Sequence, residues 1–204
     1  EETDPAKKAE FIVFILENVC GLTGSHGKWT AGPEIGTEWS VRSLSGEVIR
    51  PRRIWRGKHE SVLPLFIDEN RSLGIGKGRR SMSRVIEWLR ATRNKVALVT
   101  NYRQWRLVYA GIDHDAWAEW DTALWFPEGK PGLQLDALRI LISPDSLTPP
   151  SKDALSPLLE AIDATRRGQA ELSSSLGERV RQAVELLIQS KGNALDGIDA
   201  GPKD

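Results

Sequence analysis

The sequence has few of the residues on which disulfide-rich domains and zinc sites depend. It contains one cysteine, Cys20, and three histidines, His26, His59 and His114, in 204 residues. A single cysteine excludes an internal disulfide framework, and the four residues lack zinc-finger spacing. No apolar run approaches the roughly 20 residues that a membrane-spanning helix needs, and the N-terminal residues lack the order of a signal peptide. We therefore expect a cytoplasmic protein with no membrane partner.

Several catalytic signatures are also missing. The glycine-rich stretch GIGKGRR does not have the spacing of a Walker A loop, and it is not a dinucleotide-binding fingerprint. No G-x-S-x-G elbow anchors Ser/His/Asp catalysis, and no histidine has a second ligand at i+4. The sequence therefore offers no self-evident enzyme active site.

The net charge of zero hides an uneven distribution. Residues 42–106 contain 16 Lys and Arg against 5 Asp and Glu, a local charge of +11, and the rest of the chain carries −11. Such an asymmetry indicates a segment that faces a polyanion beside an acidic remainder.

Hydrophobic periodicity predicts an α/β domain with a mixed β-sheet flanked by helices. Helices are expected over residues 8–20, 81–92 and 133–142. Strands are expected over residues 38–43, 48–55, 62–68, 95–100 and 104–110, the first two forming a hairpin about Ser45-Gly46. Residues 21–36 are expected to be a glycine-rich loop, and the tryptophan-rich stretch 115–126 receives no assignment.

A turn-rich break, SPDSLTPPS at residues 143–151, divides the chain. Beyond it, apolar residues keep a helical period over roughly three dozen positions. We therefore predict an α/β domain over residues 1–145 and a helical connector over residues 146–204. The chain starts without methionine and ends in a Gly/Asp-rich tail, so we expect a fragment of a longer protein.

Three stretches carry a resemblance to a known family: GEVIRPRR, LPLFIDEN and, after a helix, TNYRQWRLVYAG. In that order they resemble the PD-(D/E)xK nuclease-like domain at the N-terminus of type IIG restriction enzymes and of phage-defence methyltransferases such as those of DISARM. In those proteins a T-N-G-x-x-W-x-L-Y strand pair follows the catalytic strands. The resemblance spans about residues 10–190 and implies a restriction-endonuclease-like fold. It further implies a parent that methylates adenine in DNA with S-adenosylmethionine.

The catalytic positions of that family are where this sequence departs from it. By register, the metal-binding Asp of the family falls on Arg52, the acid of (D/E)xK on Asp68, and its lysine on Asn70. A working site needs two or three carboxylates around a divalent metal, and a cation in place of a ligand repels Mg²⁺. The resemblance therefore implies an inactive nuclease-like site. The methyltransferase motifs are absent as well, so this chain alone is not expected to bind S-adenosylmethionine.

One alternative is an active, Mg²⁺-dependent DNA endonuclease. Its catalytic carboxylates would be Asp68, Glu69 and Glu47, with Glu38 as a further candidate. Sequence spacing alone does not show whether these side chains converge.

The expected partner is double-stranded DNA, contacted from the basic segment. Glycines in GIGKGRR free backbone N–H groups to face an anion, and the basic residues of this loop lie at the start of a helix whose dipole favours anions. The candidate contacts are Arg50, Arg52, Arg53, Lys77, Arg79, Arg80 and Arg84. Strand alternation would place Arg50 and Arg52 on one face, where Arg52 either meets a phosphate or pairs with Asp68.

The other interpretations are structural. The loop would be a solvated connector, and the helical tail over residues 151–189 would dock on the remainder of its own polypeptide or on defence-system subunits. Tryptophans are expected mainly in the core, with Trp88 on an apolar helix face and Trp105 on a strand. Arg103 and Arg106 would then remain at the surface.

Overall fold

The computed structural model describes residues 4–69, 72–74 and 78–199. The chain divides into two compact units, Glu1–Leu159 and Glu160–Asp204. The first is an α/β unit, and the described part of the second, residues 160–199, is the remainder of one long helix. Residues 146–159, which were expected in the connector, fall in the first unit, because Leu147 and Leu158 are buried there.

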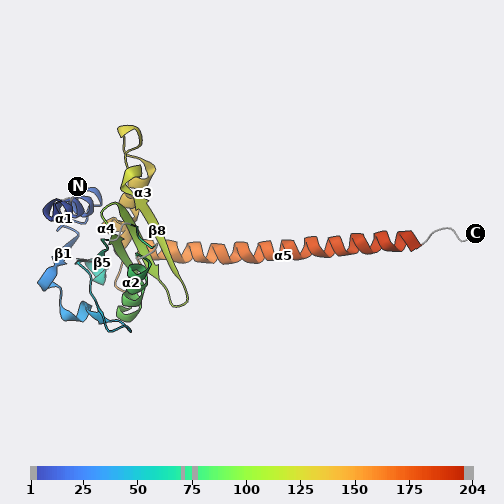
Figure 1. The fold of residues 1–204 in the computed structure, drawn as a ribbon, viewed down its shortest axis with the longest axis horizontal. Helices are drawn as coiled ribbons and strands as arrows, with labels where there is room; N and C mark the ends of the chain where they lie inside the picture. Colours follow the sequence, from blue (N-terminus) through green and yellow to red (C-terminus); the bar gives the residue numbers. More distant parts are fainter. Residues whose placement is uncertain (1–3, 70–71, 75–77, 200–204) are drawn as a thin grey trace, which may run out of the picture. The chain divides into compact units, whose positions relative to one another are not determined.

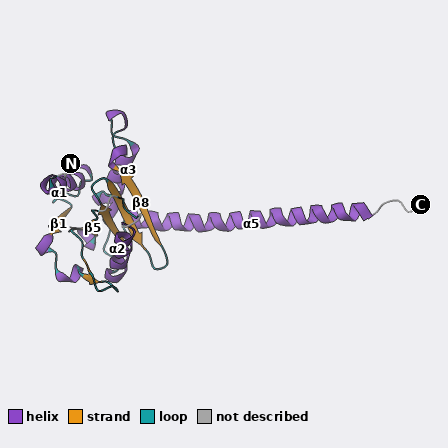
Figure 2. Ribbon diagram, in the orientation of Figure 1, coloured by secondary structure: helices purple, strands orange, loops and turns teal. Residues whose placement is uncertain are grey.

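The α/β unit is built on a mixed six-stranded sheet, with helices around it (Figures 1 and 2). The spatial order of the strands is β1-β4-β5-β6-β7-β8. Their bounds are β1 Gly27–Ala31, β4 Arg53–Gly57, β5 Val62–Ile67, β6 Val96–Thr100, β7 Gln104–Ala110 and β8 Asp115–Asp121. The predicted fold class, a mixed sheet flanked by helices, is confirmed.

One pair of strands differs from the rest. β5 and β6 run parallel, with Leu65 opposite Leu98 and Ile67 opposite Thr100, whereas every other neighbouring pair in this sheet is antiparallel. A parallel pair needs a crossover, and helix α2 (Gly78–Thr92) supplies it. The carboxyl ends of β5 and β6 therefore lie together at one edge of the sheet.

Helices cover both faces of the sheet. On one face α2 packs through Trp88 and Leu89 against a cluster that includes Phe66, Val99 and Val108. On the other face lies α1 (Pro5–Val13), whose Phe11 ring meets Trp105 edge-on at 6.3 Å. The predicted burial of Trp88 and Trp105 is confirmed, since both are 0% exposed.

The remaining helical segments are short. A π-helix, η1 (Phe14–Val19), continues α1, and α3 (Leu133–Leu141) and α4 (Pro144–Leu147) follow the sheet. Single turns of 3-10 helix complete the unit: η2 Gly32–Glu34, η3 Thr37–Trp39, η4 Lys58–Glu60, η5 Thr122–Leu124 and η6 Pro127–Gly129. The expected helix over residues 8–20 is therefore present in two parts.

The predicted first hairpin is smaller than expected. Its strands, β2 (Val41–Arg42) and β3 (Val48–Ile49), form a separate two-stranded sheet. The strand does not continue from β3 to Trp55, because Pro51 lacks the N–H that a ladder needs and restricts the residue before it. Arg50 and Arg52 therefore lie in an irregular segment, and their expected strand alternation was wrong.

Two strands were not predicted from the sequence. β1 lies inside the predicted glycine-rich loop, where Gly27 packs so closely that a Cβ would stand 2.7 Å from the Trp55 ring. β8 lies in the tryptophan-rich stretch and pairs along its whole length with β7. Because β8 covers the flank of β7, Arg106 is only 8% exposed, and its predicted surface position was wrong.

Helix α5 (Pro157–Asp199) begins in the α/β unit and forms the second unit. Within the second unit, apolar side chains on this helix are exposed, among them Leu172, Leu176 and Val180. Among the described residues, none of the helices combines the length and the apolar character needed to cross a bilayer.

Candidate nucleic-acid interface

The candidate site lies at the carboxyl ends of the parallel strands β5 and β6. Asp68 follows β5 directly, and its backbone N–H donates to the carbonyl oxygen of Thr100 at 2.9 Å. Open α/β sheets commonly bind ligands outside the carboxyl ends of their parallel strands, because loops from neighbouring strands converge there. The predicted strand ending in an acid is therefore confirmed, and it points to this edge.

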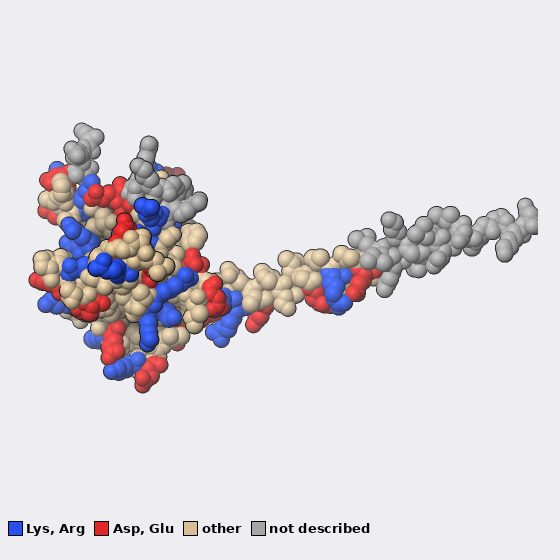
Figure 3. Space-filling view, turned by 60° about the horizontal axis from the view of Figure 1, so that its bottom comes forward, with Lys and Arg blue, Asp and Glu red and all other residues tan. Residues whose placement is uncertain are grey.

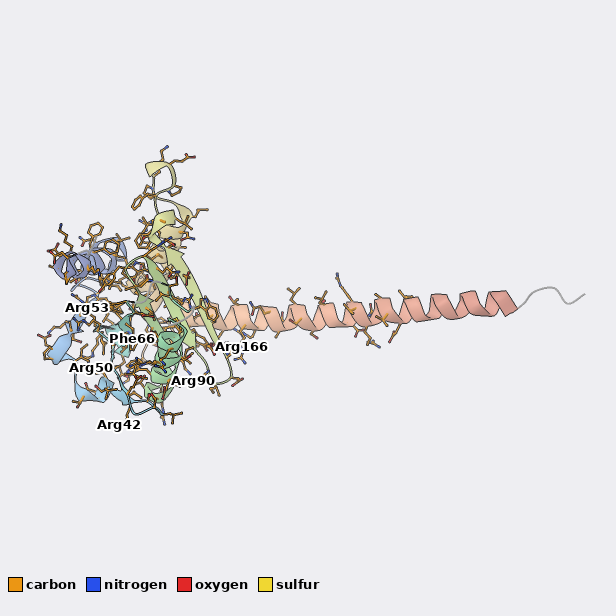
Figure 4. The ribbon with its side chains drawn as sticks, viewed as in Figure 1. Arg42, Arg50, Arg53, Phe66, Arg90 and Arg166 are labelled. Carbon is orange, nitrogen blue, oxygen red and sulfur yellow. The ribbon has the colours of Figure 1, made fainter. Side chains whose placement is uncertain are left out.

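Two open cavities adjoin each other here. The first, about 150 Å³, is bounded by β3, the end of β5 and the start of α2, and among its lining residues are Arg50, Asp68, Ser81 and Arg84. The second, about 280 Å³, is lined by Gly32, Arg50, Pro51, Arg52, Phe66 and Ile67. Arg50 and Phe66, labelled in Figure 4, line both. We call the two cavities together the arginine pocket.

The three arginines of this pocket differ in their partners. Arg50 donates to two backbone carbonyls, that of Gly32 at 3.1 Å and that of Ile35, so its guanidinium also holds the preceding loop. Arg84 forms an ion pair with Glu47 at 3.4 Å. The backbone N–H of Arg52 donates to the Leu65 carbonyl at 2.7 Å and ties this residue to β5.

The Arg52 guanidinium is exposed, and within the described part of the chain it makes no ion pair or side-chain hydrogen bond. The pairing with Asp68 that the sequence left open is therefore not found among these residues. The planar guanidinium offers its N–H donors as a fork, which matches two oxygens of a phosphate or a carboxylate group.

The other predicted contacts do not all join the pocket. Arg53 lies on β4 and lines a separate cavity against α1, with Glu10 and Phe14. Arg80 is exposed at the beginning of α2. Lys77 lies outside the described residues, as does the side chain of Arg79.

Among the described residues, no three acidic side chains gather in the way that holds a metal ion. Glu47 is paired with Arg84, and Glu38 stands 3.9 Å from Arg56. Glu69 is exposed next to Asp68, which is 7% exposed and is the only described carboxylate that lines the pocket.

The described side chains of the pocket do not suit a divalent metal. In the described ranges, no three His, Cys, Asp or Glu side chains are arranged to hold a metal ion. One carboxylate beside Arg50 and Arg84 does not fit Mg²⁺, which prefers several oxygen ligands and is repelled by cations. Asn70, the position of the family's lysine, lies outside the described residues.

Arg106 anchors the connection between β5 and α2. Its guanidinium forms an ion pair with Glu119 on β8 and donates to the Leu73 carbonyl at 3.3 Å, while Leu73 N–H donates to the Gln104 side chain at 3.0 Å. Leu73 itself is 0% exposed. The connection that carries the predicted basic residues is thus fixed to β7 and β8 immediately before Gly74.

Sequence reasoning missed Tyr102, which lies at the same edge in the turn between β6 and β7. Its φ of 74° is in the left-handed region that favours glycine. The Lys8 ammonium of α1 lies 5.0 Å from the centre of its ring. A bulky residue in so short a turn between two strong strand patterns was the available signal, because such turns need positive φ.

Charge is mixed on the face of the α/β unit that Figure 3 draws, where blue Lys and Arg side chains lie among red Asp and Glu side chains. A polyanion contact on this face would therefore depend on where particular arginines lie, because the face is not uniformly basic.

Comparison with known proteins found no match, either among protein-family models or among curated proteins.

Proposed function

We propose that this chain is the DNA-engaging module of a restriction-modification or phage-defence adenine-specific DNA methyltransferase, with an inactive nuclease-like site. The supporting observation is the arginine pocket: Arg50, Arg52 and Arg84 line it, and Asp68 is the one carboxylate among its described lining residues, at the edge where a nuclease of this type needs several. S-adenosylmethionine would be bound elsewhere in the parent protein.

The chemistry of the pocket suits a phosphate backbone. Lys and Arg side chains that neutralise phosphates release counterions, so such binding weakens linearly in the logarithm of the salt concentration. Arg52 has an exposed guanidinium on a backbone tied to β5 and lines one of the two cavities, while Arg84, held by Glu47, lines the other. The two cations can therefore contact phosphates at defined positions.

The test is fluorescence anisotropy with a labelled DNA duplex over a salt series, with and without Mg²⁺. Arg52→Ala and Arg84→Ala should each weaken binding and reduce the salt slope by about one phosphate contact. Lys95→Ala is the matched control, because Lys95 is exposed immediately before β6, at the other end of the parallel pair. Absence of binding at low salt, or equal effects of all three variants, would refute the proposal.

The burial of Asp68 in the pocket keeps an endonuclease as a second candidate. Plasmid cleavage with Mg²⁺ or Mn²⁺, abolished by Asp68→Ala, would establish it. The donor set described above leads us to expect no cleavage by the wild-type chain.

The exposed apolar side chains of α5 support a partner-contacting role for the second unit. Exposed Leu172, Leu176 and Val180 recur every fourth residue, as on helices that dock on another chain or domain. The proposed partners are the remainder of the same polypeptide or other defence-system subunits. A Leu172→Ser/Leu176→Ser variant should lose such a complex and keep its DNA affinity, measured in the same anisotropy assay.

A further inference from the structure

Tyr102 occupies a backbone conformation that is costly for a tyrosine. Its φ is +74°, where the Cβ of any residue but glycine meets its own backbone. Neighbouring side chains hold the turn: Thr100 Oγ1 accepts from the Tyr102 N–H at 2.9 Å, and Asn101 Oδ1 accepts from the Gln104 N–H at 2.6 Å. The T-N-G pattern quoted above has glycine at this position. Strained residues cluster at binding and catalytic sites, so the strain at this position indicates a function for the Tyr102 side chain.

The Tyr102 side chain is half-buried among charged groups from separate segments. Lys8 of α1 lies over its ring, with Nζ 5.0 Å from the centroid. Burial raises the pKa of the phenol, the Glu69 carboxylate raises it further, and Arg52 acts in the opposite direction. The phenol therefore keeps its proton at neutral pH and remains a hydrogen-bond donor, within electrostatic range of Arg52.

We propose that Tyr102, Lys8 and Arg52 together contact one phosphate-bearing strand of nucleic acid, with the phenol donating to a backbone phosphate that the two cations attract. This inference rests on the proposed DNA-binding function. It adds Tyr102 and Lys8 to the DNA contacts predicted from the basic segment. The three donors come from α1, the break before β4 and the β6–β7 turn. Hydrogen bonds to a charged phosphate are stronger than those between neutral groups.

Glu69 works against such a contact. Its exposed carboxylate raises the pKa of the same phenol through its charge, and a second anion nearby would be repelled. Glu69→Gln should therefore tighten DNA binding severalfold, which is the opposite of what a metal-binding or catalytic role for Glu69 would give.

The experiment uses the full 204-residue chain and a labelled duplex, in the same anisotropy assay with a salt series. Tyr102→Phe should weaken binding about tenfold, as expected for one lost hydrogen bond to a charged group, and leave the salt slope unchanged. Lys8→Gln should reduce the slope by about one contact. The matched controls are Tyr109→Phe, which removes a hydroxyl from the end of β7 distant from this turn, and Lys95→Gln.

Tyr102→Gly separates binding from folding. Glycine relieves the positive φ, so the melting temperature should stay level or rise while DNA affinity falls at least as far as in Tyr102→Phe. A large fall in melting temperature, with Tyr102→Phe binding like wild type, would assign Tyr102 to packing and overturn the inference.

The outcomes separate the two proposals. Suppose that the DNA affinity of the wild type falls steeply as salt is added and that Arg84→Ala weakens it. If both Tyr102 variants then bind DNA within twofold of the wild type, the inference is wrong and the proposed function stands. If wild type does not bind DNA at low salt, both are wrong.

Discussion

Removing Glu119 should destabilise the α/β unit, because it would leave Arg106 buried without its charge partner. The Arg106 side chain is 10% exposed, and it forms its only described ion pair with Glu119, whose side chain is 31% exposed. Among the described residues, this guanidinium also contacts the Leu73 carbonyl and the Trp117 ring, 5.3 Å away, and neither carries a compensating charge.

The magnitude follows from the burial of the two partners. Breaking a fully buried ion pair costs about 3–5 kcal/mol, whereas an exposed pair contributes about 0–1 kcal/mol. Since water reaches Glu119 but hardly reaches Arg106, Glu119→Ala should cost ~1–3 kcal/mol. In a chain of this size each kcal/mol lowers the melting temperature by about 2–4 °C.

The assay is urea denaturation followed by tryptophan fluorescence. Asp115→Ala is the matched control, because Asp115 lies on the same strand and pairs with Arg90 at 3.5 Å with both side chains exposed. That variant should change the unfolding free energy by less than about 1 kcal/mol. The double variant Glu119→Ala/Arg106→Leu should regain part of the loss, since the uncompensated charge is gone.

Equal unfolding free energies for Glu119→Ala and Asp115→Ala would refute this reasoning. The pair would then be no stronger than a surface contact, and the connection from β5 to α2 would be held by Leu73 and Gln104 alone.

The remaining predictions concern two glycines and the cysteine. Gly74→Ala should lower the unfolding free energy by more than Gly46→Ala does: both have positive φ, but of these two glycines only Gly74 lies where an added Cβ would clash with another group, the Arg106 guanidinium. Urea midpoints of the two variants measure the difference, and equal losses would contradict the close contact. Cys20 is buried and its pKa is raised to about 12, so the native thiol should resist alkylation at pH 8 and react only on unfolding. Because this pKa is raised above the unfolded value of 9.0, stability from this group is complete below pH 9 and should fall between pH 9 and 12.

Local pattern determined much of the architecture. Apolar runs at residues 96–100 and 104–110, and the amphipathic stretch leading to Thr92, predicted β6, β7 and α2 within a few residues. The prediction succeeded because the apolar face that the sequence pattern gives each element is the face that is buried, as for Trp88 and Trp105. The acid at the end of β5 could likewise be predicted, since a short apolar run of strand length that stops at Asp68 is typical of a buried strand that ends at a sheet edge.

Long-range pairing decided the rest. The sequence around Arg106 alternates like a strand with a polar face, and only the pairing of β8 along β7 brings Glu119 to Arg106. The same holds for the pocket: Arg84 and Glu47 are 37 positions apart in sequence, and only the packing of α2 beside the small hairpin brings them to 3.4 Å. Tyr102 shows most clearly what sequence alone cannot predict. Its position in a turn is local information, but its charged surroundings come from Lys8, Arg52 and Glu69, which the folded sheet alone brings together.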